Sequence, residues 1–160
     1  MNLGETFLCK IVESHKEVLQ RGLRDKNKHA AIICCETGDV RYVTIGSPKT
    51  VIYKCRSDKN YIVIHNHPNN STFSLQDLYE FYDGVHHKCL AVQGHNGISY
   101  VLSRDSKNNG KTTRSEIREI LDNVQCDPNN TILSYIQKRE IAIFMIARRM
   151  GWTFLKKEVS

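Results

Sequence analysis

The chain of 160 residues lacks the features that mark membrane-spanning, secreted or repetitive proteins. No run of eighteen apolar residues occurs, so no transmembrane helix is predicted. The N-terminal stretch 1–5 lacks the charged, apolar and small-residue regions of a secretion signal. There is no internal repeat and no low-complexity segment. We therefore expect a soluble, cytoplasmic protein with no membrane partner.

Three kinds of metal or hydrolase motif are also missing. The six cysteines include no C-x-x-C pair, and most stand in apolar contexts, which favours buried, reduced thiols over a cysteine-rich zinc site. The H-x-E and P-C-x-x-C signatures of zinc deaminases are not present. A histidine-triad hydrolase would need a third histidine two residues after His67, where Asn69 stands. These three classes are therefore disfavoured.

The composition is that of an ordinary globular domain, with 40% apolar and 25% charged residues. We predict a single domain over residues 1–160. The formal net charge of +6 leaves nucleic acid open as a partner. Basic residues gather in 104–118 and 148–157, but no aromatic-interleaved basic motif accompanies them, so this support is weak.

Hydrophobic periodicity and turn signals predict an α+β fold, with a mixed β-sheet flanked by helices. Turn signals at Thr37-Gly38-Asp39 and His95-Asn96-Gly97 predict two hairpins, one joining 30–35 to 40–45 and one joining 88–93 to 98–103. The core is expected at about 5–103 and a helical C-terminal extension at about 112–150. The predicted helices are 5–21, 75–82, 113–124 and 131–150; the predicted strands are 30–35, 40–45, 50–55, 61–65, 88–93, 98–103 and an edge strand at 152–156; 105–111 is predicted to be a loop. The run 141–147 is apolar on all sides, which predicts burial against the sheet or a partner.

The candidate metal-binding residues all lie in the segment 65–77. His65 and His67 end a hydrophobic strand, and alternate residues of a strand share a face, so both imidazoles can bind one metal ion. Ser74 then opens a helix in an S-x-x-D capping box, which holds the Asp77 carboxylate near the first turn and aims it back toward the histidines. Two imidazoles and one carboxylate leave a fourth tetrahedral position for water, which is typical of a catalytic zinc site.

These residues resemble the JAMM zinc metalloproteins, also called JAB or MPN, whose layered architecture is similar to that of cytidine deaminases. The family has an upstream Glu, then H-x-H-P, then S-x-x-D; here the match is His65-Asn66-His67-Pro68, Ser74 and Asp77. Six residues separate His67 from Ser74, one fewer than is usual. The sequence His-Asn-His-Pro is most similar to the motif of the bacterial and phage branch of the family, which includes RadC-like proteins.

The resemblance implies a role for each matched residue. His65, His67 and Asp77 would hold Zn²⁺, and Ser74 would donate a hydrogen bond to the oxyanion formed during amide hydrolysis. The family's Glu acts as general base at the start of the first core strand. His29 stands at the matching position and is our candidate for that base. Glu36, at the far end of the same strand, is a poor substitute.

Three functions follow as alternatives. The first is a zinc-dependent hydrolase that cleaves a peptide or isopeptide bond in a protein substrate, such as a ubiquitin-like conjugate. The second is a catalytically impaired structural or interaction module of phage or mobile-element origin. The third is a RadC-like protein associated with DNA, supported by the His-Asn-His-Pro wording and the positive charge.

Overall fold

The computed structural model describes residues 3–45, 58–104 and 113–158. Within them the chain forms a mixed α+β fold with four helices and six strands. In chain order these are α1 (Leu3–Asp25), β1 (Lys28–Cys34), β2 (Val40–Ile45), β3 (Tyr61–His67), α2 (Leu75–Asp83), β4 (His87–Gly94), β5 (Ile98–Arg104), α3 (Arg114–Gln125), α4 (Tyr135–Met150) and β6 (Trp152–Glu158).

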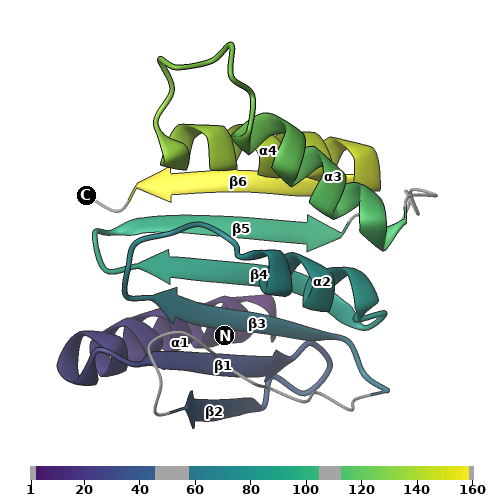
Figure 1. The fold of residues 1–160 in the computed structure, drawn as a ribbon. Helices are drawn as coiled ribbons and strands as arrows, with labels where there is room; N and C mark the ends of the chain where they lie inside the picture. The colour runs from purple at the N-terminus through teal and green to yellow at the C-terminus, as the bar shows by residue number, and fades with distance from the viewer. Residues whose placement is uncertain (1–2, 46–57, 105–112, 159–160) are drawn as a thin grey trace.

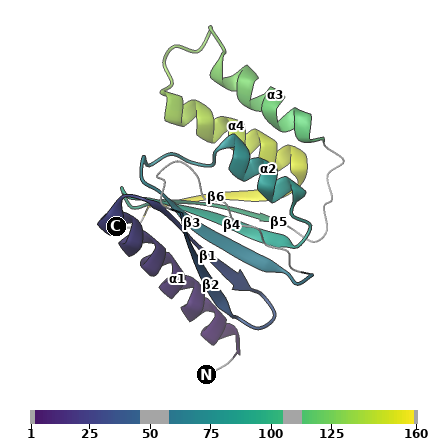
Figure 2. The same cartoon turned by 60° about the horizontal axis from the view of Figure 1, so that its bottom comes forward.

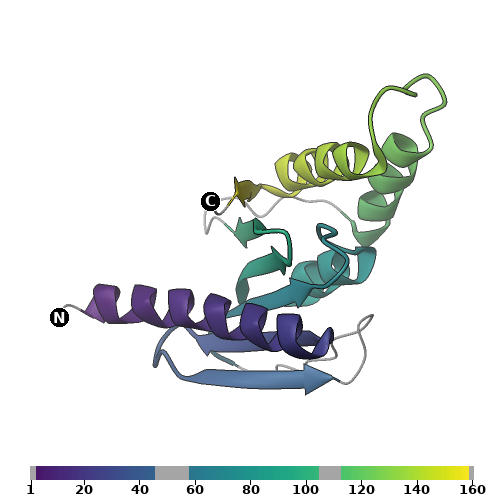
Figure 3. The same cartoon turned by 90° about the vertical axis from the view of Figure 1, so that its left-hand side faces the viewer.

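The strands form one sheet in the order β2-β1-β3-β4-β5-β6 (Figure 1). β3 and β4 are parallel, and every other neighbouring pair is antiparallel. Helix α1 covers one face of the sheet, whereas α2, α3 and α4 lie on the other (Figure 2). From the side, α1 runs along the β1 and β2 part of the sheet, and α3 and α4 lie toward β6 (Figure 3).

Each face of the sheet has its own apolar core. On the α1 side, Val18 of the helix packs with buried residues of β1, β3 and β4, including Ala31, Ile64 and Ala91. On the opposite side, a larger cluster joins the sheet to the remaining helices. Because β3 is central and covered on both faces, six of its seven residues are buried. The histidines of β3 therefore lie in the interior of the protein.

Most of the predicted elements are confirmed. The hairpins β1–β2 and β4–β5 turn where the Thr37-Gly38-Asp39 and His95-Asn96-Gly97 signals predicted, and β6 lies at an edge of the sheet. β3 runs two residues further than predicted and includes His67. The predicted strand at 50–55 and the predicted loop at 105–111 lie outside the described residues.

The C-terminal helices are part of the larger core. Ile117 and Leu121 of α3, and Ile143 and Ile146 of α4, belong to the same cluster as Val63 and Leu90 of the sheet. The all-round apolar run on α4 is covered on one side only, because its remaining apolar residues are exposed: Ile141, Phe144 and Met145.

The cysteine prediction is confirmed in part. The five described cysteines are free, but none of them is fully buried: Cys34, Cys35 and Cys89 are partly exposed, and Cys9 and Cys126 are exposed, so the expected burial is wrong for the last two. Both stand on helices or helix ends at positions that face solvent. Nowhere in the described residues does a helix combine the length and the apolar character needed to cross a bilayer.

Candidate metal centre

His65 and His67 stand at the carboxyl end of β3, beside the parallel strand β4. Their side chains share the sheet face that carries Val63, because residues two apart in a strand point the same way. Both residues are 1% exposed. The connection from β3 to α2 starts at this edge of the sheet, so the first turn of α2 can return to the two imidazoles.

The capping box of α2 holds Asp77, the third candidate metal ligand, in place. Ser74 is the N-cap residue; its Oγ accepts a hydrogen bond from the backbone N–H of Asp77 at 3.1 Å. In return, Asp77 Oδ2 accepts one from the backbone N–H of Ser74 at 2.7 Å. The carboxylate is therefore held at the helix N-terminus, on the side facing β3. This confirms the predicted capping box.

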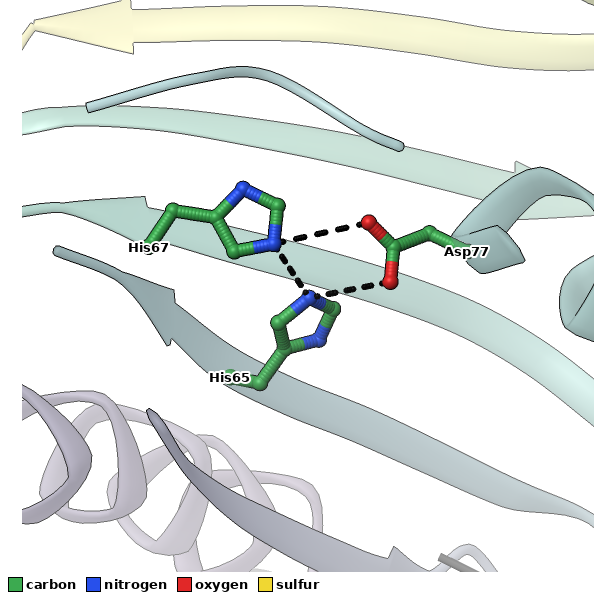
Figure 4. A group of neighbouring side chains, drawn as sticks. All are labelled: His65, His67 and Asp77. Carbon is green, nitrogen blue, oxygen red and sulfur yellow. Dashed lines mark hydrogen bonds and ion pairs between the residues drawn. The ribbon is translucent and has the colours of Figure 1, made fainter. Parts of the chain in front are cut away.

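The three side chains converge, as Figure 4 shows. His65 Nε2 and His67 Nε2 are 3.0 Å apart, and each lies 3.4 Å from one oxygen of Asp77. All the ligand atoms of the trio lie within 4.8 Å of one another. A tetrahedral ion with ligand bonds of about 2.0–2.2 Å needs donor atoms about 3.3–3.6 Å apart. The buried trio of His65, His67 and Asp77 therefore has the spacing to hold a metal ion.

The tautomer of His67 suits a metal ligand. Its Nδ1 lies 2.9 Å from the carbonyl oxygen of Ser71, which can only accept a hydrogen bond, so Nδ1 carries the proton. In the neutral ring Nε2 then presents a lone pair to His65 and Asp77. Two acceptors facing each other in a buried site require a proton or a cation between them. The residues thus fit a metal, and Ser71 orients the ring as outer-shell partners do in metal sites.

The electrostatics keep both kinds of ligand in the binding form. Burial lowers the pKa of His65, although the Asp77 carboxylate opposes that shift, so the ring is neutral at pH 7. Burial alone would raise the pKa of Asp77, but its electrostatic and hydrogen-bonding interactions with the two imidazoles outweigh that effect and hold the pKa well below its usual range. Neutral imidazoles and an ionised carboxylate are the forms that coordinate metal ions.

His29 is not brought to the trio. Ala30 is the β1 residue paired with His65, so His29 faces the opposite side of the sheet. There its Nε2 lies 2.9 Å from both carboxylate oxygens of Asp25, and its Nδ1 is 3.0 Å from Thr44 Oγ1. The prediction that His29 is a base beside the metal rested on its place along the strand, and strand alternation turns the ring away.

Glu36 lies past the opposite end of β1. Cys34 pairs with Tyr61 at the start of β3, far from the histidines at its end, and Glu36 follows Cys34. Its carboxylate is 3.8 Å from the ammonium group of Lys59. This position agrees with the expectation that Glu36 is a poor substitute for the upstream Glu of the JAMM family.

Two supporting residues were missed from the sequence. Ser71 contacts His67 Nδ1 through its backbone carbonyl at 2.9 Å and through its hydroxyl at 3.1 Å, and neither the H-x-H-P nor the S-x-x-D motif includes this residue. Asn66, between the histidines, is fully buried, and its amide joins the start of β1 to the β4–β5 turn. An asparagine inside a buried strand was the available signal, because buried amides need hydrogen-bond partners.

Comparisons of the chain with protein-family models, with curated proteins and with solved structures found no match. The evidence for a metal site is therefore the geometry of His65, His67 and Asp77 in this structure.

Proposed function

We propose that this protein is a zinc-dependent hydrolase of the JAMM type that cleaves a peptide or isopeptide bond. The convergence of two imidazoles and one carboxylate from β3 and α2 carries the proposal. Zinc is the metal of choice because nitrogen donors with a single carboxylate, at tetrahedral spacing, suit it better than ions that prefer all-oxygen sites.

The matched residues would have two roles in hydrolysis: holding the metal ion and stabilising the oxyanion. His65, His67 and Asp77 would hold the ion, and zinc bound there would act as a Lewis acid on the substrate carbonyl and on water. Ser74 Oγ accepts a hydrogen bond from Asp77, so its hydroxyl proton points elsewhere. That proton can be donated to the carbonyl oxygen as negative charge develops on it during attack.

Proton removal from water would depend on solvent or buffer. On the trio's face of β1, Ala30 is paired with His65 and its same-face neighbours are Lys28 and Ile32, so within the described residues this strand offers no carboxylate there. We therefore expect slow hydrolysis whose rate rises with the concentration of an added base such as imidazole.

The test is hydrolysis of a peptide library and of a lysine-linked isopeptide by the purified chain loaded with zinc. His67→Ala should abolish both zinc binding and cleavage, while His86→Ala, outside the trio, should change neither. Ser74→Thr keeps the hydroxyl and should retain activity; Ser74→Asp keeps the helix cap without a donor and should lower kcat about 10²-fold. Cleavage that survives His67→Ala would eliminate the hydrolase.

A second candidate is a structural metal-binding module without catalysis. It is favoured by the near-complete burial of both histidines, at 1% exposure each. One equivalent of bound zinc with no cleavage of any library member would support it over the hydrolase.

A further inference from the structure

A cavity of about 200 Å³ lies between the segment that follows β3 and the start of α4. Ser71, Thr72 and Ser74 line it from one side, and Tyr135 and Arg139 from the other. It is smaller than the roughly 300–1,000 Å³ of a site that encloses a whole small-molecule ligand. It can therefore receive only one end of a larger substrate.

The cavity adjoins the metal trio through two of its lining residues. The carbonyl of Ser71 accepts the hydrogen bond from His67, and Ser74 caps the helix turn that carries Asp77. A group bound in the cavity would therefore lie next to the bond presented to the metal.

Thr72 leaves a polar atom unsatisfied beside this space. The residue is 3% exposed, and among the described residues its hydroxyl has no hydrogen-bond partner. Buried hydroxyls in folded proteins are nearly always hydrogen-bonded, since leaving one unpaired is unfavourable. A ligand oxygen in the cavity would supply the missing partner.

Arg139 makes the cavity cationic. Its Nε and Nη2 donate to the carbonyl oxygen of Phe73 at 3.2 and 3.1 Å, and Nη1 donates to Gln125 Oε1 at 3.1 Å. A guanidinium group has five N–H donors, so two are not taken by described residues. No carboxylate is among the described residues that line the cavity.

Arg139 keeps its charge, and two helix N-termini add to the positive potential of the cavity. Burial lowers the pKa of Arg139, and the nearby Tyr135, Asp77 and Asp122 partly offset that shift, so the group stays a cation at neutral pH. Helices α2 and α4 both begin at the cavity, so the positive ends of their dipoles also face it.

We propose that this cavity binds a carboxylate group of the substrate, adjacent to the bond that is cleaved. The inference rests on the proposed hydrolase, whose substrate class it narrows to peptides that present either a free C-terminus or an acidic side chain near that bond. Thr72 would donate one hydrogen bond to the carboxylate, and Arg139 would donate a charge-assisted one.

Binding to the full chain after metal chelation tests the proposal, because a carboxylate then cannot bind zinc. Three probes are titrated while backbone amide NMR shifts are followed: N-acetylglycine, N-acetylglycinamide, and N-acetyl-aspartic acid α-amide. We expect the carboxylate probes to shift the amides of 71–74 and 135–139 saturably, and the uncharged glycinamide to bind at least about tenfold more weakly. The tighter of the two acids identifies the source of the carboxylate.

Variants make the test specific. Thr72→Val keeps the side-chain shape and should weaken binding of the carboxylate probes about tenfold, whereas Thr72→Ser should retain it. Thr153→Val, at an exposed position of β6, is the matched control. Equal binding of the acid and amide probes, or unchanged affinity in Thr72→Val, would overturn the proposal. Because no catalysis is measured, this result is independent of whether the chain hydrolyses peptides.

Discussion

Asn66 ties three parts of the protein together from its position between the two metal-competent histidines. Its Oδ1 accepts the backbone N–H of His29 at 2.6 Å, and its Nδ2 donates to the carbonyl of Asn27 and to His95 Nε2, both at 2.9 Å. Since neighbouring strand residues point to opposite faces, the same short stretch directs the histidines to the metal face and the amide to the α1 face. This network fixes the end of β3 and so the direction of both imidazoles.

At the residue scale, His87 should make stability depend on pH. Burial, followed by the charge of Arg104, lowers its pKa from 6.5 to about 3, and it is enclosed by Tyr61 and Phe81. Between about pH 3 and pH 6.5, the His87 side chain therefore binds a proton in the unfolded chain but not in the folded chain. The free energy of unfolding should therefore fall as pH falls below 6.5, by up to about 1.4 kcal/mol per pH unit from this group.

Urea unfolding of the metal-free protein between pH 7 and pH 4.5 measures this effect. His87→Phe retains an aromatic ring against Tyr61 and Phe81 but cannot titrate, so its stability should fall less steeply over the same range. Parallel curves for the wild type and this variant would mean that His87 is not the proton-linked group.

At the element scale, Arg104 of β5 holds the C-terminal end of α2. Its guanidinium donates to the carbonyls of Phe81 and Tyr82 on α2, and its Nε donates to the carbonyl of His87 at 3.0 Å. A lysine ammonium cannot reach all three acceptors. Arg104→Lys should therefore lower the free energy of unfolding by about 2–3 kcal/mol.

The same change should weaken zinc binding, because α2 carries Asp77 at its other end. Urea unfolding and a zinc titration measure the two effects. Arg118→Lys is the control. Arg118 forms an exposed ion pair with Asp122 at 3.6 Å, so this change should leave the free energy of unfolding almost unaltered. Equal costs for the two variants would show that Arg104 does not anchor the helix.

Gly22 allows α1 to approach the β3 terminus. Alanine in place of glycine normally stabilises a helix interior by about 0.5–1 kcal/mol. At Gly22, however, a Cβ would overlap the amide nitrogen of Asn66 and come within 2.9 Å of His95 Nε2. Gly22→Ala should therefore destabilise the protein by about 2 kcal/mol, as measured by denaturant unfolding. Gly4→Ala, at the exposed start of α1, should be neutral or slightly stabilising; a stabilising Gly22→Ala would contradict this packing.

At the scale of the whole molecule, a metal ion held by His65, His67 and Asp77 would link β3 to α2 and should stabilise the fold. The three candidate ligands converge only when β3 and α2 are in place, so the proposed zinc ion would bind the folded state preferentially. At a free zinc concentration 100 times Kd, the gain is about 2.7 kcal/mol, which corresponds to a rise of about 5–10 °C in Tm.

Thermal unfolding with zinc and with chelator measures that gain. Asp77→Asn can still accept the hydrogen bond from Ser74 but loses the charged ligand, so most of the zinc-dependent rise should disappear. Glu116→Gln alters the equivalent capping box of α3, where Glu116 accepts from the backbone N–H of Thr113, and should keep the full rise. A zinc effect that persists in Asp77→Asn would place the stabilising ion elsewhere.

The sequence by itself determined the features that depend on short-range patterns. Strand alternation placed His65 and His67 on one face, the S-x-x-D pattern gave the capping box of Asp77, and the Gly-containing turns gave both hairpins. These follow from backbone geometry over a few residues, so no distant contact was needed to predict them. The nucleic-acid partner suggested by the charge of +6 stays a prediction.

Only the tertiary structure decided what depends on which face a residue occupies and what packs across it. His29 is one residue from the position opposite His65, and that offset turns it toward Asp25 and away from the metal face. Arg139 reaches Phe73, 66 residues earlier in the chain and in the loop that leads into α2, only because α4 packs on the same side of the sheet. Register and long-range packing are set by the summed burial of the whole core, which no local pattern specifies.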